Sequence, residues 1–150
     1  MKHKAIIVDI DGTISDGSWR ILGKDLSTID WNQENLKSLH DQPFDWCVKL
    51  VNLFYKDGYK IIFLTARTGT VECYQVTHQW LSSHLDIPYE LFMREEHDQR
   101  DDDIIKQDIY YKHIEPSFDI LFAIDDKPEV IDMWRNLGIT ALHCRDYMYG

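Results

Sequence analysis

Short apolar runs alternate along the chain with segments whose apolar residues recur at helical spacing. The apolar runs predict strands at residues 4–8, 59–64, 89–93, 118–124 and 139–143. The segments between them predict helices at residues 43–58, 70–85, 101–114 and 128–138. Strands that alternate with helices form βαβ units, so the sequence predicts an α/β, Rossmann-like fold: a parallel sheet with helices on both faces.

Each predicted helix carries apolar or aromatic positions that we expect to face the sheet. Pro43 is expected to open the first helix, Gly58 to follow its last turn, and Pro128 to stand in the first turn of the last helix. The expected core positions, helix by helix, are Phe44, Val48, Val51 and Tyr55, then Tyr74, His78, Leu81 and Leu85, then Ile104, Ile105, Ile109 and Tyr111, then Val130, Ile131, Trp134 and Leu137.

The stretch from about residue 14 to residue 42 interrupts this alternation and has no regular period. Its apolar residues are numerous enough to predict a small lid that inserts after the first strand and folds down on the sheet. These residues are Trp19, Ile21, Leu22, Leu26, Ile29 and Trp31. With this lid included, we expect residues 1–150 to form a single domain.

Composition narrows the class of protein. The chain is 44% hydrophobic, enough for one core, and no apolar stretch approaches the roughly 20 residues of a membrane span. The basic start leads into a run too short for a signal peptide, so we expect a soluble, cytoplasmic protein without a membrane partner. Cys47, Cys73 and Cys144 are widely spaced and form no Cys-x-x-Cys pair, which favours buried thiols.

The formal net charge of −10 argues against a long nucleic-acid groove, because such grooves rely on many lysines and arginines. It does not exclude recognition of one terminal phosphate. The histidines show no zinc-like spacing.

Candidate chemistry begins where the first strand ends. Asp9 and Asp11 follow the apolar run directly, and Gly12 supplies a turn. Carboxylates about 4 Å apart repel by about 4 kcal/mol at an effective dielectric near 20, so a divalent cation with oxygen ligands is expected between them. The alternative is a strand end whose aspartates cap a helix and face water, since Asp-x-Asp-Gly also occurs in turns and calcium loops.

Two further strands end in polar residues. Thr65 and Arg67 follow the second strand, and Asp125 and Asp126 follow the fourth. Because the carboxyl ends of parallel strands open on one edge of a sheet, we expect these side chains to meet Asp9 and Asp11 there. Taken singly, each has a simpler alternative: the Asp pair and Thr65 as caps, and an arginine near a strand end as a surface residue.

Together these strand ends, with a lysine on an intervening helix, resemble the haloacid dehalogenase superfamily of phosphotransferases. The superfamily's four motifs match Asp9-Ile10-Asp11-Gly12-Thr13, Thr65, Lys106 and Asp125-Asp126.

Within that superfamily the chain is most similar to the 3′-phosphatase domain of the bacteriophage polynucleotide kinase/phosphatase. The likeness runs over nearly the whole chain, is strongest in residues 100–106 and 111–119, and continues through residues 123–138. Positions that match functional residues of that domain are Asp9, Asp11, Arg20, Thr65, Arg67, Asp102, Lys106, Asp125 and Asp126. The stretch between Asp11 and Pro43 is longer than its equivalent there. The chain has no Gly-x-x-x-x-Gly-Lys-Ser/Thr loop, so it is expected to be a phosphatase without a kinase.

The resemblance implies a mechanism through a phosphoaspartate. In it, Asp9 attacks phosphorus, and Asp11 protonates the leaving sugar oxygen and then activates water. It also implies Mg²⁺ held by Asp9, by the backbone carbonyl of Asp11, by at least one of Asp125 and Asp126, and by waters.

The same resemblance implies roles for the remaining matches. Thr65 and Lys106 are expected to hold the phosphoryl group, with Asp102 one helical turn earlier positioning Lys106. Without the resemblance, Asp102 and Lys106 would be read as an exposed i,i+4 salt bridge. Arg20 and Arg67 are expected to bind the substrate phosphate or the next one along a strand. Trp19 and Trp31 could stack on a terminal base, or pack against the domain.

A small lid leaves the site open, which favours a 3′-phosphate at a nucleic-acid end, or a 3′-nucleotide, as substrate. A kinase or ligase partner would fit this role. A phosphatase of small phosphate esters and a non-catalytic module that binds phosphate ends remain as alternatives.

Overall fold

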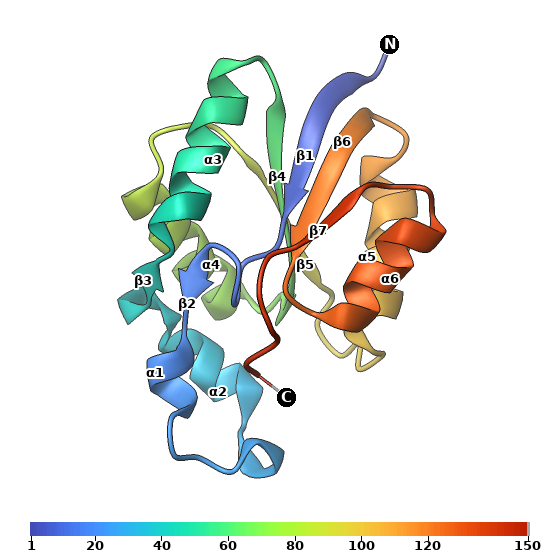
Figure 1. Cartoon of the computed structure of the whole chain (residues 1–150). Coiled ribbons are helices and arrows are strands. Elements are labelled where there is room, and N and C mark those ends of the chain that lie inside the picture. Colours follow the sequence, from blue (N-terminus) through green and yellow to red (C-terminus); the bar gives the residue numbers. More distant parts are fainter. Residues whose placement is uncertain (150) are drawn as a thin grey trace.

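A parallel sheet forms the centre of the molecule, with helices on both faces (Figure 1). The structure is a computed structural model and describes residues 1–149. The sheet strands are β1 (His3–Val8), β4 (Lys60–Thr68), β5 (Glu90–Arg94), β6 (Phe118–Asp125) and β7 (Ala141–His143). Their spatial order is β5-β4-β1-β6-β7, and every neighbouring pair is parallel. The predicted Rossmann-like fold class is therefore confirmed.

The longer helices connect the strands. They are α3 (Asp45–Lys56), α4 (Val71–His84), α5 (Asp102–Ile109), which continues into the π-helical turn η3 (Tyr110–Ile114), and α6 (Pro128–Asn136). Among the helices formed by residues 1–149, none combines the length and the apolar character that a membrane crossing requires.

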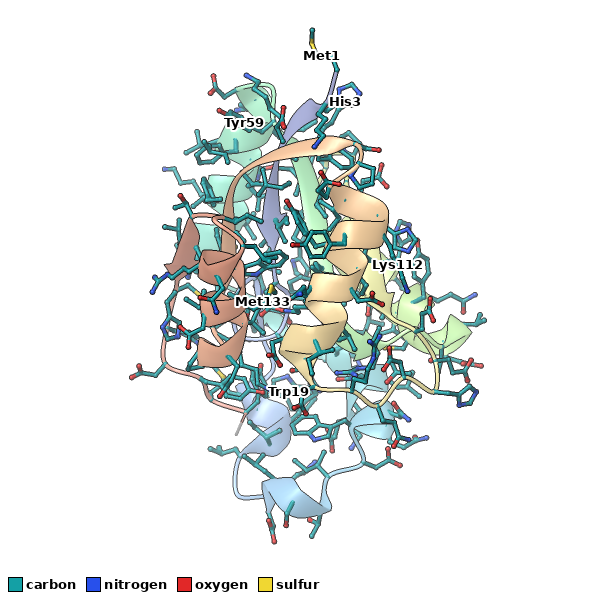
Figure 2. All side chains as sticks on the ribbon, turned by 90° about the vertical axis from the view of Figure 1, so that its right-hand side faces the viewer. Met1, His3, Trp19, Tyr59, Lys112 and Met133 are labelled. Atoms are coloured by element: carbon teal, nitrogen blue, oxygen red, sulfur yellow. The ribbon has the colours of Figure 1, made fainter. Side chains whose placement is uncertain are left out.

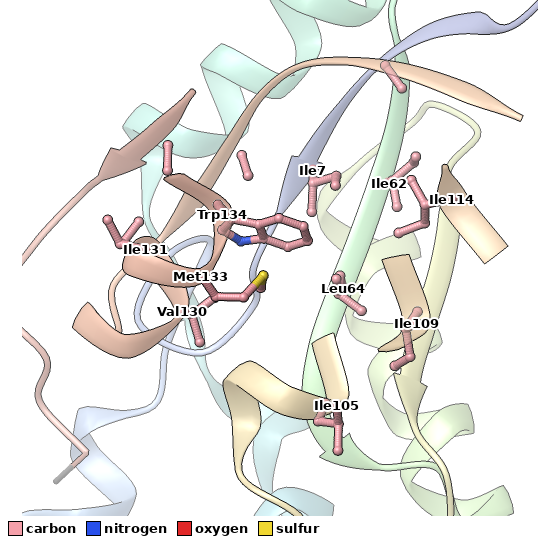
Figure 3. Packing of buried hydrophobic residues seen from close by; sticks show 13 residues of the cluster. Ile7, Ile62, Leu64, Ile105, Ile109, Ile114, Val130, Ile131, Met133 and Trp134 are labelled. Carbon is pink, nitrogen blue, oxygen red and sulfur yellow. The ribbon is translucent and has the colours of Figure 1, made fainter. Parts of the chain in front are cut away.

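Alternate residues of the central strands enter opposite cores, as expected for a sheet that is buried on both faces. Ile7, Ile62 and Leu64 pack on one face with residues of α5 and α6, including Trp134, whose indole lies against the sheet in Figure 3. On the other face Val8 and Phe63 pack with residues of α3 and α4. The sheet is thus rigidly held, and so are the residues at its carboxyl edge.

The stretch between β1 and α3 forms small elements at that edge. They are β2 (Ser15–Asp16), α1 (Ser18–Ile21), η1 (Leu26–Thr28), α2 (Trp31–Leu36), η2 (Ser38–His40) and β3 (Gln42–Pro43). β2 and β3 pair in antiparallel fashion and close the base of this insertion. Figure 2 shows Trp19 of α1 at the opposite end of the molecule from Met1 and His3.

The structure corrects several sequence expectations about the helices. Pro43 does not open a helix, because it pairs with Ser15 in the short ribbon and α3 begins at Asp45. In α4 the buried face contains Cys73, Thr77 and Trp80 with Leu81, while Tyr74 and His78 are exposed and stack on each other. On this face Trp80 and Leu81 enter the core and Thr77 accepts a hydrogen bond from a buried arginine of β4.

In α5 only half of the expected core is buried. Ile105 and Ile109 lie in the core, whereas Ile104 and, in the following π-helical turn, Tyr111 are exposed. The buried stripe of α5 is shared with Lys106, which points into the site described next. The thiols match expectation: all three cysteines are free, Cys47 and Cys73 are buried, and Cys144 is partly buried.

Candidate active site

A cavity of about 450 Å³ lies at the carboxyl edge of the sheet. Every residue named as a site candidate from the sequence lines it: Asp9, Asp11, Arg20, Thr65, Arg67, Asp102, Lys106, Asp125 and Asp126. The strand ends and the insertion therefore do converge.

The turn after β1 allows the Asp126 carboxylate to lie close to the backbone. Backbone N–H groups of Thr13, Ile14 and Ser15 all donate to the Ile10 carbonyl, which folds the chain tightly around Gly12. Gly12 has φ +83°, and a Cβ there would lie 2.0 Å from Asp126 Oδ2. Only glycine both adopts this backbone and leaves room for the Asp126 carboxylate.

Asp9, Asp125 and Asp126, here called the carboxylate cluster, each place an oxygen within 4.8 Å of the others. All three are buried. Asp125 Oδ1 accepts the backbone N–H groups of Asp126 and Lys127, at 2.9 and 3.1 Å, which fixes the turn into α6. The alternative of a helix cap is wrong, because the N-cap residue of α6 is Lys127 and no side chain among residues 1–149 caps that helix. The second oxygen of Asp125 faces the cavity and accepts from a lysine of α5.

Lys106 is the cation that meets the carboxylate cluster. Its Nζ donates to Asp9 Oδ1 at 2.9 Å and to Asp125 Oδ2 at 2.7 Å. Burial alone would lower the lysine pKa, but the charges of Asp125 and Asp9 outweigh it and raise the pKa above its usual value. Lys106 is therefore a permanently charged group at the base of the cavity.

One lysine does not neutralise three carboxylates. Burial, and then the charge of Asp125, raise the pKa of Asp9 to about 7. Burial and the charges of Asp9 and Asp125 raise the pKa of Asp126 to about 10. Asp126 Oδ2 is buried and has no hydrogen-bond partner among residues 1–149. An unpartnered carboxylate oxygen beside two other carboxylates fits a hard divalent cation such as Mg²⁺.

Asp11 has different surroundings. Arg67 binds its carboxylate through two hydrogen bonds, from Nε at 2.8 Å and from Nη2 at 2.6 Å, and an Nη of Arg20 lies 3.6 Å away. Burial acts to raise the pKa of Asp11, but the charge and hydrogen bonds of Arg67, with the charge of Arg20, lower it below its ordinary value. Asp11 is thus an anion in this structure.

Asp41 is a buried ion-pair partner of the two arginines on this side, and sequence reasoning missed it. Its buried carboxylate accepts two hydrogen bonds from Arg20, at 2.8 and 2.9 Å, and one each from Ser15 Oγ and Trp19 Nε1. The set of Asp11, Asp41, Arg20 and Arg67 is here called the arginine cluster. A single aspartate in an irregular stretch gives no signal that could have identified it.

Both arginines are almost fully buried, with exposed fractions of 3% for Arg20 and 4% for Arg67. The alternative of Arg67 as a surface residue near a strand end is therefore wrong. Arg67 also donates to the hydroxyls of Ser38 and Thr77, and its own backbone N–H donates to Thr65 Oγ1 at 3.2 Å. Thr65 is buried at the cavity wall.

The expected contact between Asp102 and Lys106 is not present, either as a positioning contact or as a surface salt bridge. Asp102 instead accepts from Arg94 at 2.6 Å and from Lys127 at 3.0 Å, while Lys106 points inward to the carboxylate cluster. Lys106 binds residues distant in the sequence because two buried carboxylates attract it more strongly than one partly exposed aspartate on its own helix does.

The lining also contains residues that the sequence did not suggest. Arg94, Asn35, Tyr147 and Tyr149 contribute to the cavity wall. The two tyrosines come from the segment after β7, where no periodic pattern marks them.

Comparison with known proteins identifies relatives of the whole fold. A family model of the polynucleotide kinase PNKP phosphatase domain matches residues 3–149. A candidate bifunctional polynucleotide kinase/RNA ligase of Autographa californica nuclear polyhedrosis virus is 29% identical over 148 residues, which cover 97% of this chain and 20% of that protein.

Solved structures of other proteins share this fold. A chain of the Pnkp1/Rnl/Hen1 complex is 27% identical, with a TM-score of 0.80, over 98% of this chain and 47% of that one. A haloacid dehalogenase superfamily hydrolase from Ehrlichia chaffeensis, 15% identical, shares the fold with a TM-score of 0.52 over 95% of this chain and 92% of its own. The chain thus spans less than half the length of the viral protein and of the chain in the complex.

Proposed function

From its membership of the polynucleotide kinase PNKP phosphatase domain family of haloacid dehalogenase phosphatases, we propose that the chain is a magnesium-dependent phosphomonoesterase. The proposed substrates are the 3′-phosphates of nucleic-acid ends or of 3′-nucleotides. The observation that carries the proposal is the joint placement, in one cavity, of an under-neutralised carboxylate cluster and two buried arginines. Such a cavity offers a place for a cation beside a place for a phosphate.

Mg²⁺ fits the carboxylate cluster, with Asp9, Asp126 and Asp125 as the side chains that would hold it and the Asp11 backbone carbonyl as a further proposed ligand. When bound, the ion supplies positive charge that lets an anionic carboxylate and an anionic phosphate approach each other. The chain's own residues perform the remaining steps.

Asp9 is the proposed nucleophile. Thr13 Oγ1 donates to Asp9 Oδ2 at 3.1 Å and Lys106 donates to Oδ1, so the carboxylate is held in one orientation at the cavity floor. In the proposed step an Asp9 oxygen forms a bond to phosphorus while the bond from phosphorus to the sugar oxygen breaks. The product is a phosphoaspartate, which water then hydrolyses.

Asp11 is the proposed acid and base, and its present partner matters. As a carboxylate bound by Arg67 it cannot donate a proton. We propose that a substrate phosphate takes the Arg67 guanidinium, because phosphate offers the same two-oxygen acceptor as a carboxylate. Burial then raises the pKa of Asp11, so that it can be protonated, donate to the leaving sugar oxygen and later accept a proton from water.

Arg20, Thr65 and Asp102 have supporting roles in this proposal. Arg20 and Thr65 line the cavity beside Arg67, where they can contact phosphate oxygens. Asp102 holds Arg94 and Lys127, two cations at the open side of the cavity that can face a second phosphate of a strand. We further propose that residues 1–150 are one phosphatase domain with residues 14–42 as its lid.

Names of relatives suggest the context. The viral relative is named for kinase and ligase activities, and the solved relative comes from a complex of Pnkp1, Rnl and Hen1. We propose that this domain works with a kinase or ligase on nucleic-acid ends, in the cytoplasm.

The test is phosphate release from a matched panel: 3′-phosphorylated oligonucleotides, 3′-nucleotides, 5′-nucleotides and sugar phosphates, each with Mg²⁺ or with EDTA. The expected result is Mg²⁺-dependent turnover that is fastest with the 3′-phosphates. Faster turnover of 5′-nucleotides or sugar phosphates would support the small-ester alternative. No release from any substrate would leave a phosphate-binding module as the better explanation.

A further inference from the structure

Three aromatic side chains form a continuous wall along one side of the cavity. Trp31 of α2, Tyr149 and Tyr147 all line it. The rings of Trp31 and Tyr149 meet edge to face with centroids 6.3 Å apart, and those of Tyr149 and Tyr147 are 5.9 Å apart. The wall joins two segments that are more than a hundred residues apart in the sequence, the insertion and the C-terminal segment.

The wall begins at the catalytic turn. The Tyr149 hydroxyl accepts the Gly17 N–H at 3.2 Å, and the ring edge lies 3.2 Å from the position that a Cβ on Gly12 would take. Asp11, the proposed acid, immediately precedes Gly12. A group attached to the leaving sugar oxygen at Asp11 therefore lies within reach of aromatic surface.

The far part of the wall remains open. Trp31 is 37% exposed. Tyr147 is partly exposed, with Lys127 Nζ 5.0 Å from its ring centroid. Other exposed tryptophans, such as Trp46 on α3, do not line this cavity. Aromatic surface is thus available specifically beside the charged groups.

We propose that the nucleobase next to the scissile 3′-phosphate stacks on the wall of Trp31, Tyr147 and Tyr149. Every base has a π face, so such stacking is tolerant of sequence but requires a base. The site would then distinguish a nucleotide from a sugar phosphate of the same charge. This inference rests on the proposed 3′-phosphatase function and adds that the aromatic wall recognises the nucleobase of the substrate.

The experiment compares two substrates that differ only in the base: a 3′-nucleotide and the corresponding abasic deoxyribose 3-phosphate. The wild type is expected to show a KM for the nucleotide that is lower by about ten-fold, because one stacked base contributes a factor of that order. In Trp31→Ala and Tyr147→Ala this advantage of the nucleotide is expected to shrink to about two-fold or less. Trp31→Phe and Tyr147→Phe are expected to restore most of it.

Trp46→Ala is the matched control, since it removes an exposed tryptophan that does not line the cavity. It is expected to keep the full ratio of the two KM values. If the wild type turns over both substrates with equal KM, or if the alanine variants retain the wild-type ratio, the stacking proposal is wrong while the phosphatase proposal stands. If neither substrate is turned over, the proposed function fails first.

Discussion

The two sides of the cavity are both buried and ionic, but they differ in charge balance. In the carboxylate cluster, Asp9, Asp125 and Asp126 face one lysine, and one of their oxygens has no partner among residues 1–149. In the arginine cluster, two carboxylates face two guanidinium groups at 2.6 to 3.9 Å. The first side is therefore arranged to gain a cation. The second is complete as it stands and must exchange a partner to bind an anion.

This difference helps to distinguish carboxylates that are kept for catalysis from carboxylates that stabilise the fold. A buried carboxylate with a raised pKa is a cost to the fold, and its retention indicates a function. A buried carboxylate that is fully hydrogen-bonded supports the fold, whether or not it also acts on substrate. The free energy of unfolding should therefore respond oppositely to the loss of a carboxylate from the two sides.

Loss of the Asp9 carboxylate should have the largest effect. Asp9→Asn is expected to lower kcat by about a thousand-fold or more, because the nucleophile is removed. The free energy of unfolding should not fall, because the change removes one negative charge from a cluster of carboxylates that repel one another. Initial rates of phosphate release and a urea titration in EDTA measure the two effects. Retention of a tenth of the activity would rule out Asp9 as nucleophile, and Asp108→Asn on the surface is the control.

Asp41→Asn should show the opposite pattern. It leaves Arg20 buried without a full counter-charge, which costs about 3–5 kcal/mol of unfolding free energy. Urea unfolding followed by circular dichroism measures this loss. Asp132→Asn, at an exposed position of α6, is the matched control and should change little. An unchanged midpoint for Asp41→Asn would show that the arginine cluster does not hold the insertion in place.

The charge imbalance also predicts how pH and Mg²⁺ act together. The folded-state pKa of Asp9, about 7, lies above the ordinary value of 3.8. Its contribution to stability is therefore fully present below pH 3.8 and is lost as the pH rises through 7. This loss builds up between pH 3.8 and pH 7, so metal-free protein should be less stable at pH 8 than at pH 6.

Mg²⁺ needs deprotonated ligands, so it should restore stability most strongly at pH 8. The gain is about 2.7 kcal/mol when Mg²⁺ is at 100 times its Kd. Thermal unfolding at both pH values, with EDTA or Mg²⁺, tests this. Asp126→Asn should unfold at a higher temperature than wild type in EDTA and should respond less to Mg²⁺. Equal Mg²⁺ shifts in wild type and variant would argue against a metal at the carboxylate cluster.

The smallest expected effect is that of Trp19→Phe. This change removes one indole hydrogen bond to Asp41, at 2.8 Å, and leaves the two from Arg20 in place. A loss of about 1 kcal/mol is expected, with Trp46→Phe as the control. A loss as large as that of Asp41→Asn would mean that Trp19, not the ion pair, organises this side.

Sequence reasoning was most successful where chemistry follows an apolar strand. Asp9 directly follows β1, and Asp125 is the last residue of β6. Because a parallel sheet brings the carboxyl ends of its strands to one edge, the proximity of these two aspartates could be predicted. Asp41 could not be found in this way, because its partners come from separate short elements without a period. Asp102 does line the cavity, but its predicted contact with Lys106 was wrong, because i,i+4 spacing describes a helix alone and ignores the acids across the cavity.

The course of the C-terminal segment has a practical consequence for anyone who expresses this protein. Tyr149 packs beside Gly12 and Gly17, whereas Met1 lies at the far end of the sheet (Figure 1). An affinity tag or fused protein inserted after Tyr149 would start next to the cavity and could obstruct long substrates. The same addition in front of Met1 would begin on the opposite side, so an N-terminal tag is the better choice for every assay described above.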